Sequence, residues 1–143
     1  MQAKNEIGSA IQPDTQTVLV AEDEVLVRMA LSERLRDVGF HVLEAANGDE
    51  ARKIVIAVGG VIDIVISDVH MARPGEGIEF AMWMAEHYPE IPLILASGDK
   101  AVATAPEVIA CRNVTDFVQK PYSEWQMEQL ARQRVESRSV SGK

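Results

Sequence analysis

An apolar run that ends in two carboxylates begins the patterned part of the chain: Thr17-Val18-Leu19-Val20-Ala21-Glu22-Asp23. Four more short runs rich in Val, Ile or Leu follow it, and we expect each run to be a buried strand. The predicted strands are Thr17 to Ala21, His41 to Ala45, Asp63 to Ser67, Ile91 to Ala96 and Asp116 to Val118. Continuous apolar runs of this length are typical of parallel sheets that are covered on both faces.

Helical patterns lie between the predicted strands. The first places Val27, Leu31, Leu35 and Val38 on one face and ends at Gly39, where a helix-terminating glycine is expected. Because strands and helices alternate, right-handed crossovers should build one parallel sheet with helices on both faces. The sequence therefore predicts a doubly wound α/β domain.

Three further helices have recognisable ends. The second helix begins at Asn47, with Glu50 three residues later as in a capping box, and it ends at the Gly59-Gly60 pair. The third stops before Pro89, and the fifth follows Pro121.

The fourth helix, Asp99 to Arg112, is weak. Pro106 has no backbone N–H to donate, and several neighbouring residues are β-branched. We expect this element to be short, bent or mobile.

The composition limits the class of protein. The chain of 143 residues is 47% hydrophobic and 25% charged, which is typical of one globular domain. We place the domain at residues 17–136, between flexible polar tails at 1–16 and 137–143. A net charge of −8 argues against nucleic-acid binding, which relies on clustered Lys and Arg. Without a bilayer-spanning run or a secretory signal, we expect no membrane partner and a cytoplasmic location.

Polar residues follow four of the predicted strands. Glu22 and Asp23 follow the first strand, Asp68 the third, Ser97 the fourth and Lys120 the fifth. The carboxyl ends of parallel strands meet at one edge of a sheet, which is where such sheets bind ligands. We therefore expect all five side chains to face one crevice.

The chemistry of this set favours phosphoryl transfer beside a metal ion. Three neighbouring carboxylates repel one another unless a cation lies between them, and Mg²⁺ prefers oxygen ligands. Zinc is disfavoured because His and Cys are not clustered. Asp68 is best placed to form an aspartyl-phosphate, with Lys120 and Ser97 as helpers that stabilise the transferred group. The stretch Pro74 to Gly77 is expected to form an open, mobile loop over the site.

Each of these residues has an ordinary structural explanation when it is taken alone. A Glu-Asp pair after a strand, such as Glu22-Asp23, commonly caps a helix. A serine before a glycine, such as Ser97, is typical of a turn, and a lysine such as Lys120 usually lies on the protein surface. The combination is harder to explain in this way, because one fold places every member at the same edge of the sheet.

Four ordered segments resemble the motifs of response-regulator receiver domains. They are Val18-Leu19-Val20-Ala21-Glu22-Asp23-Glu24, Ser67-Asp68-Val69-His70-Met71, Leu95-Ala96-Ser97-Gly98 and Phe117-Val118-Gln119-Lys120-Pro121. The resemblance covers about residues 17–135. It implies the flavodoxin-like receiver fold, a five-stranded parallel sheet with the strand order 2-1-3-4-5.

The resemblance also implies a role for each matching residue. Asp68 resembles the phosphoacceptor. Asp23 and Asp68 would bind Mg²⁺ directly, the His70 main-chain carbonyl would be a further ligand, and Glu22 would bind through water. Mn²⁺ is able to replace Mg²⁺ in such a site. Lys120 resembles the phosphate-binding lysine, which precedes a cis proline in the family.

Other matches concern switching and phosphate lifetime. Ser97 resembles the switch hydroxyl, and Phe117 resembles the aromatic residue whose rotamer changes with it, although Phe117 alone would be assigned to the core. His70 and Asp99 resemble positions that tune the phosphorylated lifetime. The chain departs from the common family pattern at Ala72, where a proline often stands, and in the weak fourth helix.

The implied function is a signalling phosphoacceptor and not an enzyme that turns over a substrate. A sensor histidine kinase or a phosphotransfer protein would be the donor. The face formed by the fourth helix, fifth strand and fifth helix would then bind a downstream protein or a second copy of the chain. Trp125 and Tyr122 are candidates for that face, with ordinary packing against the sheet as an equal alternative. Other open roles are a relay carrier, a non-phosphorylated pseudo-receiver and a small-substrate phosphatase.

Overall fold

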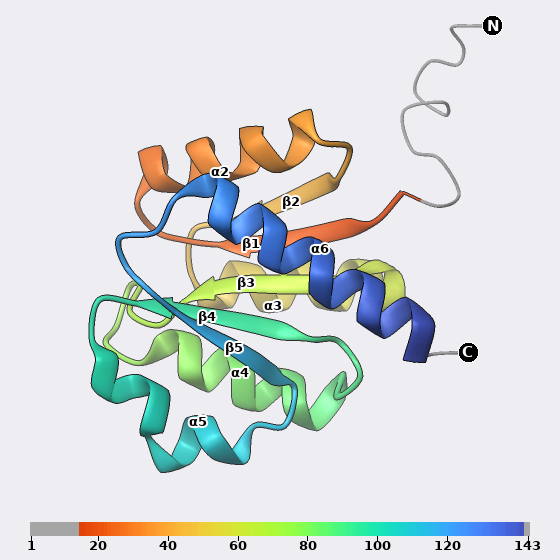
Figure 1. Cartoon of the computed structure of the whole chain (residues 1–143). Helices are drawn as coiled ribbons and strands as arrows, with labels where there is room; N and C mark the ends of the chain where they lie inside the picture. The colour runs from red at the N-terminus through yellow and green to blue at the C-terminus, as the bar shows by residue number, and fades with distance from the viewer. Residues whose placement is uncertain (1–14, 142–143) are drawn as a thin grey trace, which may run out of the picture.

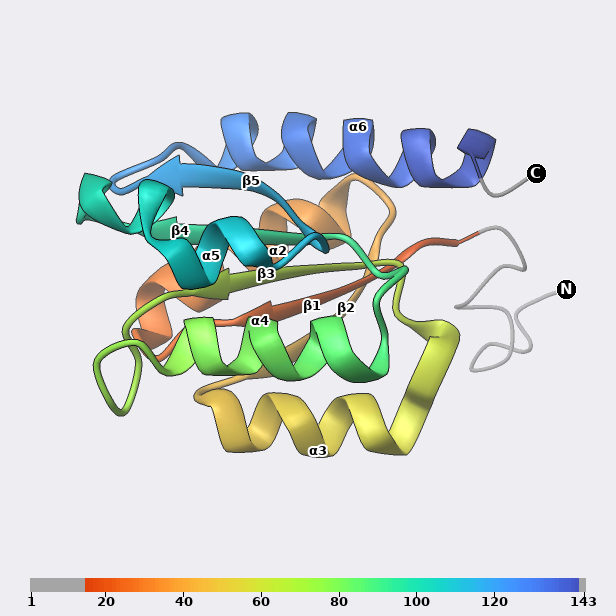
Figure 2. The ribbon, with the colours of Figure 1, turned by 90° about the horizontal axis from the view of Figure 1, so that it is seen from below.

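The computed structural model describes residues 15–141, with side chains described through residue 137. Five parallel strands lie in the order β2-β1-β3-β4-β5, which confirms the predicted doubly wound fold. The strands are β1 (Thr17–Ala21), β2 (His41–Ala45), β3 (Ile64–Asp68), β4 (Leu93–Ser97) and β5 (Val114–Gln119). Their arrowheads point toward one end of the molecule in Figure 2, so the carboxyl ends of the strands share one edge.

Helices cover both faces of this sheet (Figure 1). On one face lie α2 (Val25–Asp37) and α6 (Glu124–Ser141); on the other lie α3 (Gly48–Val58), α4 (Glu76–His87) and α5 (Pro106–Ala110). Two 3-10 turns, η1 (Gly59–Val61) and η2 (Lys100–Thr104), join these elements.

Each face of the sheet has its own apolar core. Strand side chains alternate between the two cores: Val18 and Val20 pack with Leu35 and Met127 under α2 and α6, whereas Leu19 packs on the α3 and α4 side. This two-residue alternation follows from the pleat, because successive strand residues point to opposite faces. Both faces are buried, which explains why the strands are continuously apolar.

Local sequence signals fix the ends of two helices as predicted. The Asn47 side chain accepts a hydrogen bond from the Glu50 N–H at 2.9 Å, and the Glu50 carboxylate accepts one from the Ala46 N–H at 2.8 Å. This pair is a variant of the capping box at the start of α3, in which Glu50 accepts from the residue before the N-cap and not from Asn47 itself. Gly39, after α2, has a φ of 106°, a backbone conformation that favours glycine.

The weak fourth helix is short and interrupted, as predicted. The 3-10 turn η2 ends at Thr104, Ala105 is extended, and α5 then spans only Pro106–Ala110. Proline fits the first turn of a helix, where its missing N–H breaks no bond, so Pro106 starts a new helix and prevents one continuous helix.

Three strands have boundaries that differ from the sequence prediction. β3 runs from Ile64 to Asp68, one residue later than expected at both ends, and β5 is longer than expected, from Val114 to Gln119. β4 begins at Leu93 because Ile91 donates its N–H to the Tyr88 carbonyl in the preceding turn and Pro92 has no N–H to donate to the sheet.

The last helix is also longer than predicted. α6 continues to Ser141, through most of the stretch 137–143 that was expected to be a tail. No glycine or proline interrupts the sequence between Pro121 and Gly142, so nothing local forces the helix to end earlier. Of the predicted amino-terminal tail, residues 1–14 lie outside the described residues.

Candidate functional site

Three carboxylates meet at the carboxyl edge of the sheet. Glu22 follows β1, Asp68 ends β3, and these two strands are direct neighbours. Glu22 and Asp68 are 4% and 8% exposed, whereas Asp23 is open to solvent. One oxygen from each of the three side chains lies within 4.8 Å of the others. The predicted acidic cluster is therefore present, with an all-oxygen ligand set that could hold a metal ion.

Lys120 completes the charged part of the site. It follows β5, and its Nζ lies 2.8 Å from Glu22 Oε1 and 3.2 Å from Asp68 Oδ2. The main-chain N–H of Lys120 donates to the Ser97 carbonyl at 2.9 Å, and the peptide bond between Lys120 and Pro121 is cis. The fold thus joins the lysine to two carboxylates that precede it by many residues in the sequence.

Burial changes the protonation equilibria in this cluster. Burial raises the pKa of the Glu22 carboxyl to about 7, because the Lys120 hydrogen bond offsets only part of the desolvation. Burial alone would lower the pKa of Lys120, but the Glu22 hydrogen bond and the Asp68 charge outweigh it and raise this pKa. One ammonium for three carboxylates leaves the site short of positive charge, which favours a bound cation.

Ser97 and Phe117 lie on the neighbouring strands β4 and β5. Ser97 is the last residue of β4 and is almost fully buried. Its Oγ accepts a hydrogen bond from the Asp99 N–H at 3.1 Å. Phe117, on β5, is half-buried and packs against the core on the α3 and α4 side. The described hydrogen bond of Ser97 thus holds its hydroxyl toward the following loop.

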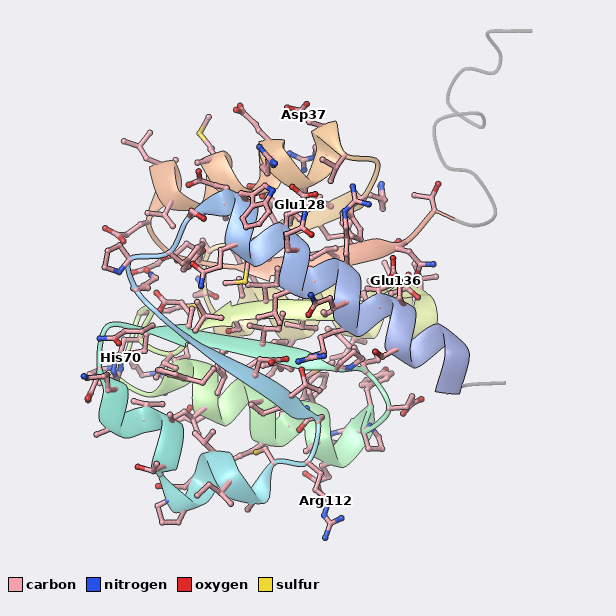
Figure 3. The ribbon with its side chains drawn as sticks, viewed as in Figure 1. Asp37, His70, Arg112, Glu128 and Glu136 are labelled. Carbon is pink, nitrogen blue, oxygen red and sulfur yellow. The ribbon has the colours of Figure 1, made fainter. Side chains whose placement is uncertain are left out.

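His70 and Asp99 lie at the exposed rim of the site. His70 follows β3, and its labelled side chain is at the outer edge of the molecule in Figure 3. Its Nδ1 accepts from the Gly75 N–H at 2.9 Å, so a neutral imidazole carries its proton on Nε2. The Asp99 carboxylate accepts a hydrogen bond from the Ala101 N–H at 3.0 Å and thereby caps the start of η2.

The stretch Pro74 to Gly77 was predicted to be an open, mobile loop over the site. This prediction is wrong for Glu76 and Gly77, which form the buried first turn of α4. Glu76 is 3% exposed, and its Oε1 accepts from the Ala72 N–H at 2.9 Å. Gly77 donates its N–H to the Val69 carbonyl at 2.8 Å. A Cβ at Gly77 would lie 1.9 Å from the Asp68 carbonyl oxygen, so only glycine fits there. The sequence patterns did not predict this packing, although a glycine within a helix is a signal of close packing.

A sequence model of the response regulator receiver domain matches residues 18–132. The chain is 36% identical over 120 residues to the sensor kinase CckA of Brucella abortus, covering 84% of this chain and 12% of that protein. It is 31% identical over 118 residues to the regulatory protein VirG of Agrobacterium tumefaciens, covering 82% of this chain and 42% of that protein. The chain therefore spans less than half the length of these two curated relatives.

Solved structures show the same fold. The receiver domain of the hybrid histidine kinase CckA superposes with a TM-score of 0.69 at 28% identity, over 83% of this chain and 98% of that chain. A CheY-like receiver protein of Methanospirillum hungatei superposes with a TM-score of 0.80 at 13% identity, over 90% and 99%. Among the described residues, none of the helices is long and apolar enough to cross a membrane. The motifs, the strand order and the acidic cluster agree with these matches, and the chain belongs to the response regulator receiver domain family.

Proposed function

We propose that this receiver accepts a phosphoryl group on Asp68 from a phosphohistidine of a sensor histidine kinase or a phosphotransfer protein. The observation that supports this most directly is the position of Lys120 Nζ, 3.2 Å from Asp68 Oδ2 and 2.8 Å from Glu22 Oε1, two members of the acidic cluster that also contains Asp23. An Asp68 oxygen forms the new P–O bond as the donor's P–N bond breaks, and the leaving imidazole takes up a proton. Such transfer depends mainly on positioning and charge neutralisation.

The set of metal ligands fits Mg²⁺, with Mn²⁺ able to replace it, because all three side chains of the acidic cluster offer carboxylate oxygens. We propose Asp23, Asp68 and the His70 main-chain carbonyl as direct ligands, and Glu22 as a ligand through water. When bound, the ion would supply charge neutralisation to the phosphoryl oxygens. Lys120 supplies a second positive charge from its position between Glu22 and Asp68.

Phosphorylation would be read out through β5 and the helices beside it. The Ser97 hydroxyl leaves the Asp99 N–H and donates to a phosphoryl oxygen, and Phe117 changes rotamer with it. As a result, a pre-existing equilibrium between two conformations of the face formed by α5, β5 and α6 shifts toward one of them. Trp125, which is 59% exposed at the start of α6, is available to a partner there, whereas Tyr122 is half-buried against the core. The rim residues His70 and Asp99 would set the access of hydrolytic water.

The donor protein has to reach the carboxyl edge of the sheet, and exposed apolar residues lie close to it. Leu26 is 79% exposed and Met29 is 45% exposed, both near the start of α2. The start of α2 also borders a groove of about 360 Å³ whose lining includes Val27, Lys120 and Tyr122. We propose that the donor's helices pack on this part of α2, because apolar contact there brings its histidine to Asp68.

A relay role is the second candidate. A receiver that is 28% identical to this chain belongs to a hybrid histidine kinase, and α5, with five residues, offers only a small output surface. As a relay carrier, the chain would pass its phosphoryl group from Asp68 to a histidine of a phosphotransfer protein. Transfer of label from the phosphorylated chain to such a protein supports this role, and hydrolysis without transfer argues against it.

The direct test is incubation with acetyl phosphate, with and without Mg²⁺, followed by intact mass measurement. We expect a Mg²⁺-dependent gain of one phosphoryl group that Asp68→Asn abolishes. Asp37→Asn is the matched control, because Asp37 is an exposed carboxylate at the far end of α2 (Figure 3). Equal incorporation by Asp68→Asn would contradict the assignment. Failure of the wild type with both acetyl phosphate and a phosphorylated kinase would leave a pseudo-receiver that acts by binding alone.

A second test separates donor docking from chemistry. Leu26→Glu should slow transfer from a phosphorylated kinase at least tenfold, because it places a charge in an apolar contact. It should leave phosphorylation by acetyl phosphate unchanged. Ile56→Glu is the matched control, since Ile56 is 67% exposed on α3, on the other face of the sheet. Equal transfer rates for the two variants would exclude the α2 surface.

A further inference from the structure

The edge strand β2 contributes no carboxylate to the cluster, yet it is tied to the acidic loop through one arginine. Arg28, in the first turns of α2, donates from Nη1 to the Glu22 main-chain carbonyl at 2.7 Å. Its Nε lies 3.2 Å from Glu44 Oε1, on β2. The Arg28 side chain is only 17% exposed. The guanidinium therefore bridges the loop after β1 and the neighbouring strand.

The main chain of Glu22 is held at both of its polar atoms. Its N–H donates to the Ala45 carbonyl at 3.0 Å, and its carbonyl accepts from Arg28. Both contacts fasten the same residue to β2, the first directly and the second through Glu44. The carbonyl that Arg28 holds belongs to the peptide that joins Glu22 to Asp23, so this contact sets where the Asp23 Cα lies.

We infer that Arg28, oriented by Glu44, is a positioning residue for the acidic cluster, and this inference rests on the proposed metal-dependent function. Asp23 is exposed, so packing does not fix its carboxylate, and the main chain has to do so. A hydrogen bond from a charged, largely buried guanidinium is among the stronger contacts available for this purpose. Groups that orient metal ligands in this way change metal affinity by about 10–100-fold when they are removed.

The chain offers a closely matched control on the same carboxylate. Arg36 Nη2 lies 2.9 Å from Glu44 Oε2 and 3.1 Å from the Val42 carbonyl. Arg36 therefore makes an ion pair with Glu44 and a main-chain contact to β2, but its described contacts do not include Glu22. A purely structural role for these ion pairs predicts similar effects from Arg28→Met and Arg36→Met, whereas a positioning role predicts a difference.

The experiment compares the wild type, Arg28→Met, Arg28→Lys and Arg36→Met as full-length proteins. Calorimetric titration with Mg²⁺ should show about tenfold weaker binding for Arg28→Met, partial recovery for Arg28→Lys, and no change for Arg36→Met. Urea unfolding, run in parallel, reports the stability of each variant. Equal Mg²⁺ affinity in Arg28→Met and Arg36→Met, or a loss in both that follows stability alone, would overturn the inference.

A metal-free measurement separates this inference from the proposed function. The Glu24 N–H donates to Glu22 Oε2 at 3.2 Å, so amide hydrogen exchange at Glu24 reports the order of the acidic loop. Arg28→Met should accelerate this exchange at least tenfold, and Arg36→Met should not. If the wild type binds no Mg²⁺, the proposed function fails, and the exchange rates still decide whether Arg28 orders the loop. Unchanged exchange in Arg28→Met would overturn the inference.

Discussion

Replacing Gly77 with alanine should destabilise the domain by about 3 kcal/mol. The added Cβ would lie 1.9 Å from the Asp68 carbonyl oxygen and 2.8 Å from the Val69 Cα, and these are main-chain atoms that cannot rotate away. Such overpacking costs about 1–3 kcal/mol, and displacing the buried hydrogen bond from Gly77 to Val69 costs about 1–3 kcal/mol more. The better helix propensity of alanine returns about 1 kcal/mol.

Urea unfolding followed by circular dichroism measures this loss. With an m-value of about 2 kcal/mol/M, the midpoint should fall by about 1.5 M. Gly60→Ala is the control, because a Cβ at Gly60 meets nothing within 4 Å, and its stability should stay within about 0.5 kcal/mol of the wild type. If Gly77→Ala unfolds at the same midpoint as Gly60→Ala, the close approach of α4 to the end of β3 is refuted.

Three further predictions concern a helix cap and two titrating carboxyl groups. Asn47→Ala removes the cap of α3 and should lower the free energy of unfolding, measured in urea, by about 1 kcal/mol. Asn47→Asp should keep the wild-type free energy of unfolding, and equal stabilities for the two variants would contradict the cap. Burial raises the Asp116 pKa, but hydrogen bonds, chiefly from Arg134, outweigh it and lower the pKa below 3.8. Arg134→Met should therefore lower the free energy of unfolding by about 1 kcal/mol at pH 7. This loss of stability should become smaller as acid protonates Asp116, and a loss that does not depend on pH would argue against the pairing. Since burial raises the Glu22 pKa from 4.5 to about 7, the folded chain binds more protons than the unfolded chain in this range. Glu22 should thus lower stability as pH rises from 4.5 to 7, and a Glu22→Gln variant with the wild-type slope in metal-free unfolding would exclude this effect.

The sequence alone predicted the parts of the fold that depend on local patterns. Continuous apolar runs indicated buried parallel strands, and the Asn47 cap marked the start of α3 at the observed residue. Pro106 indicated the interrupted fourth helix. Strand-end positions also predicted the meeting of Glu22, Asp23 and Asp68, because alternating strands and helices place all carboxyl ends at one edge. The roles proposed for Ser97, Phe117, His70 and Asp99 remain predictions.

Only the tertiary structure decided the contacts that position this cluster. The Lys120 ion pair with Glu22 joins residues 98 positions apart, and the Arg28 contact with Glu44 crosses from a helix to an edge strand. The burial of Glu76 and the close approach of Gly77 depend on how α4 packs against the end of β3. Periodicity and capping describe a residue's relation to its neighbours in sequence. Hydrogen bonds, burial and the raised Glu22 pKa depend instead on residues brought together by chain folding, so no local pattern determines them.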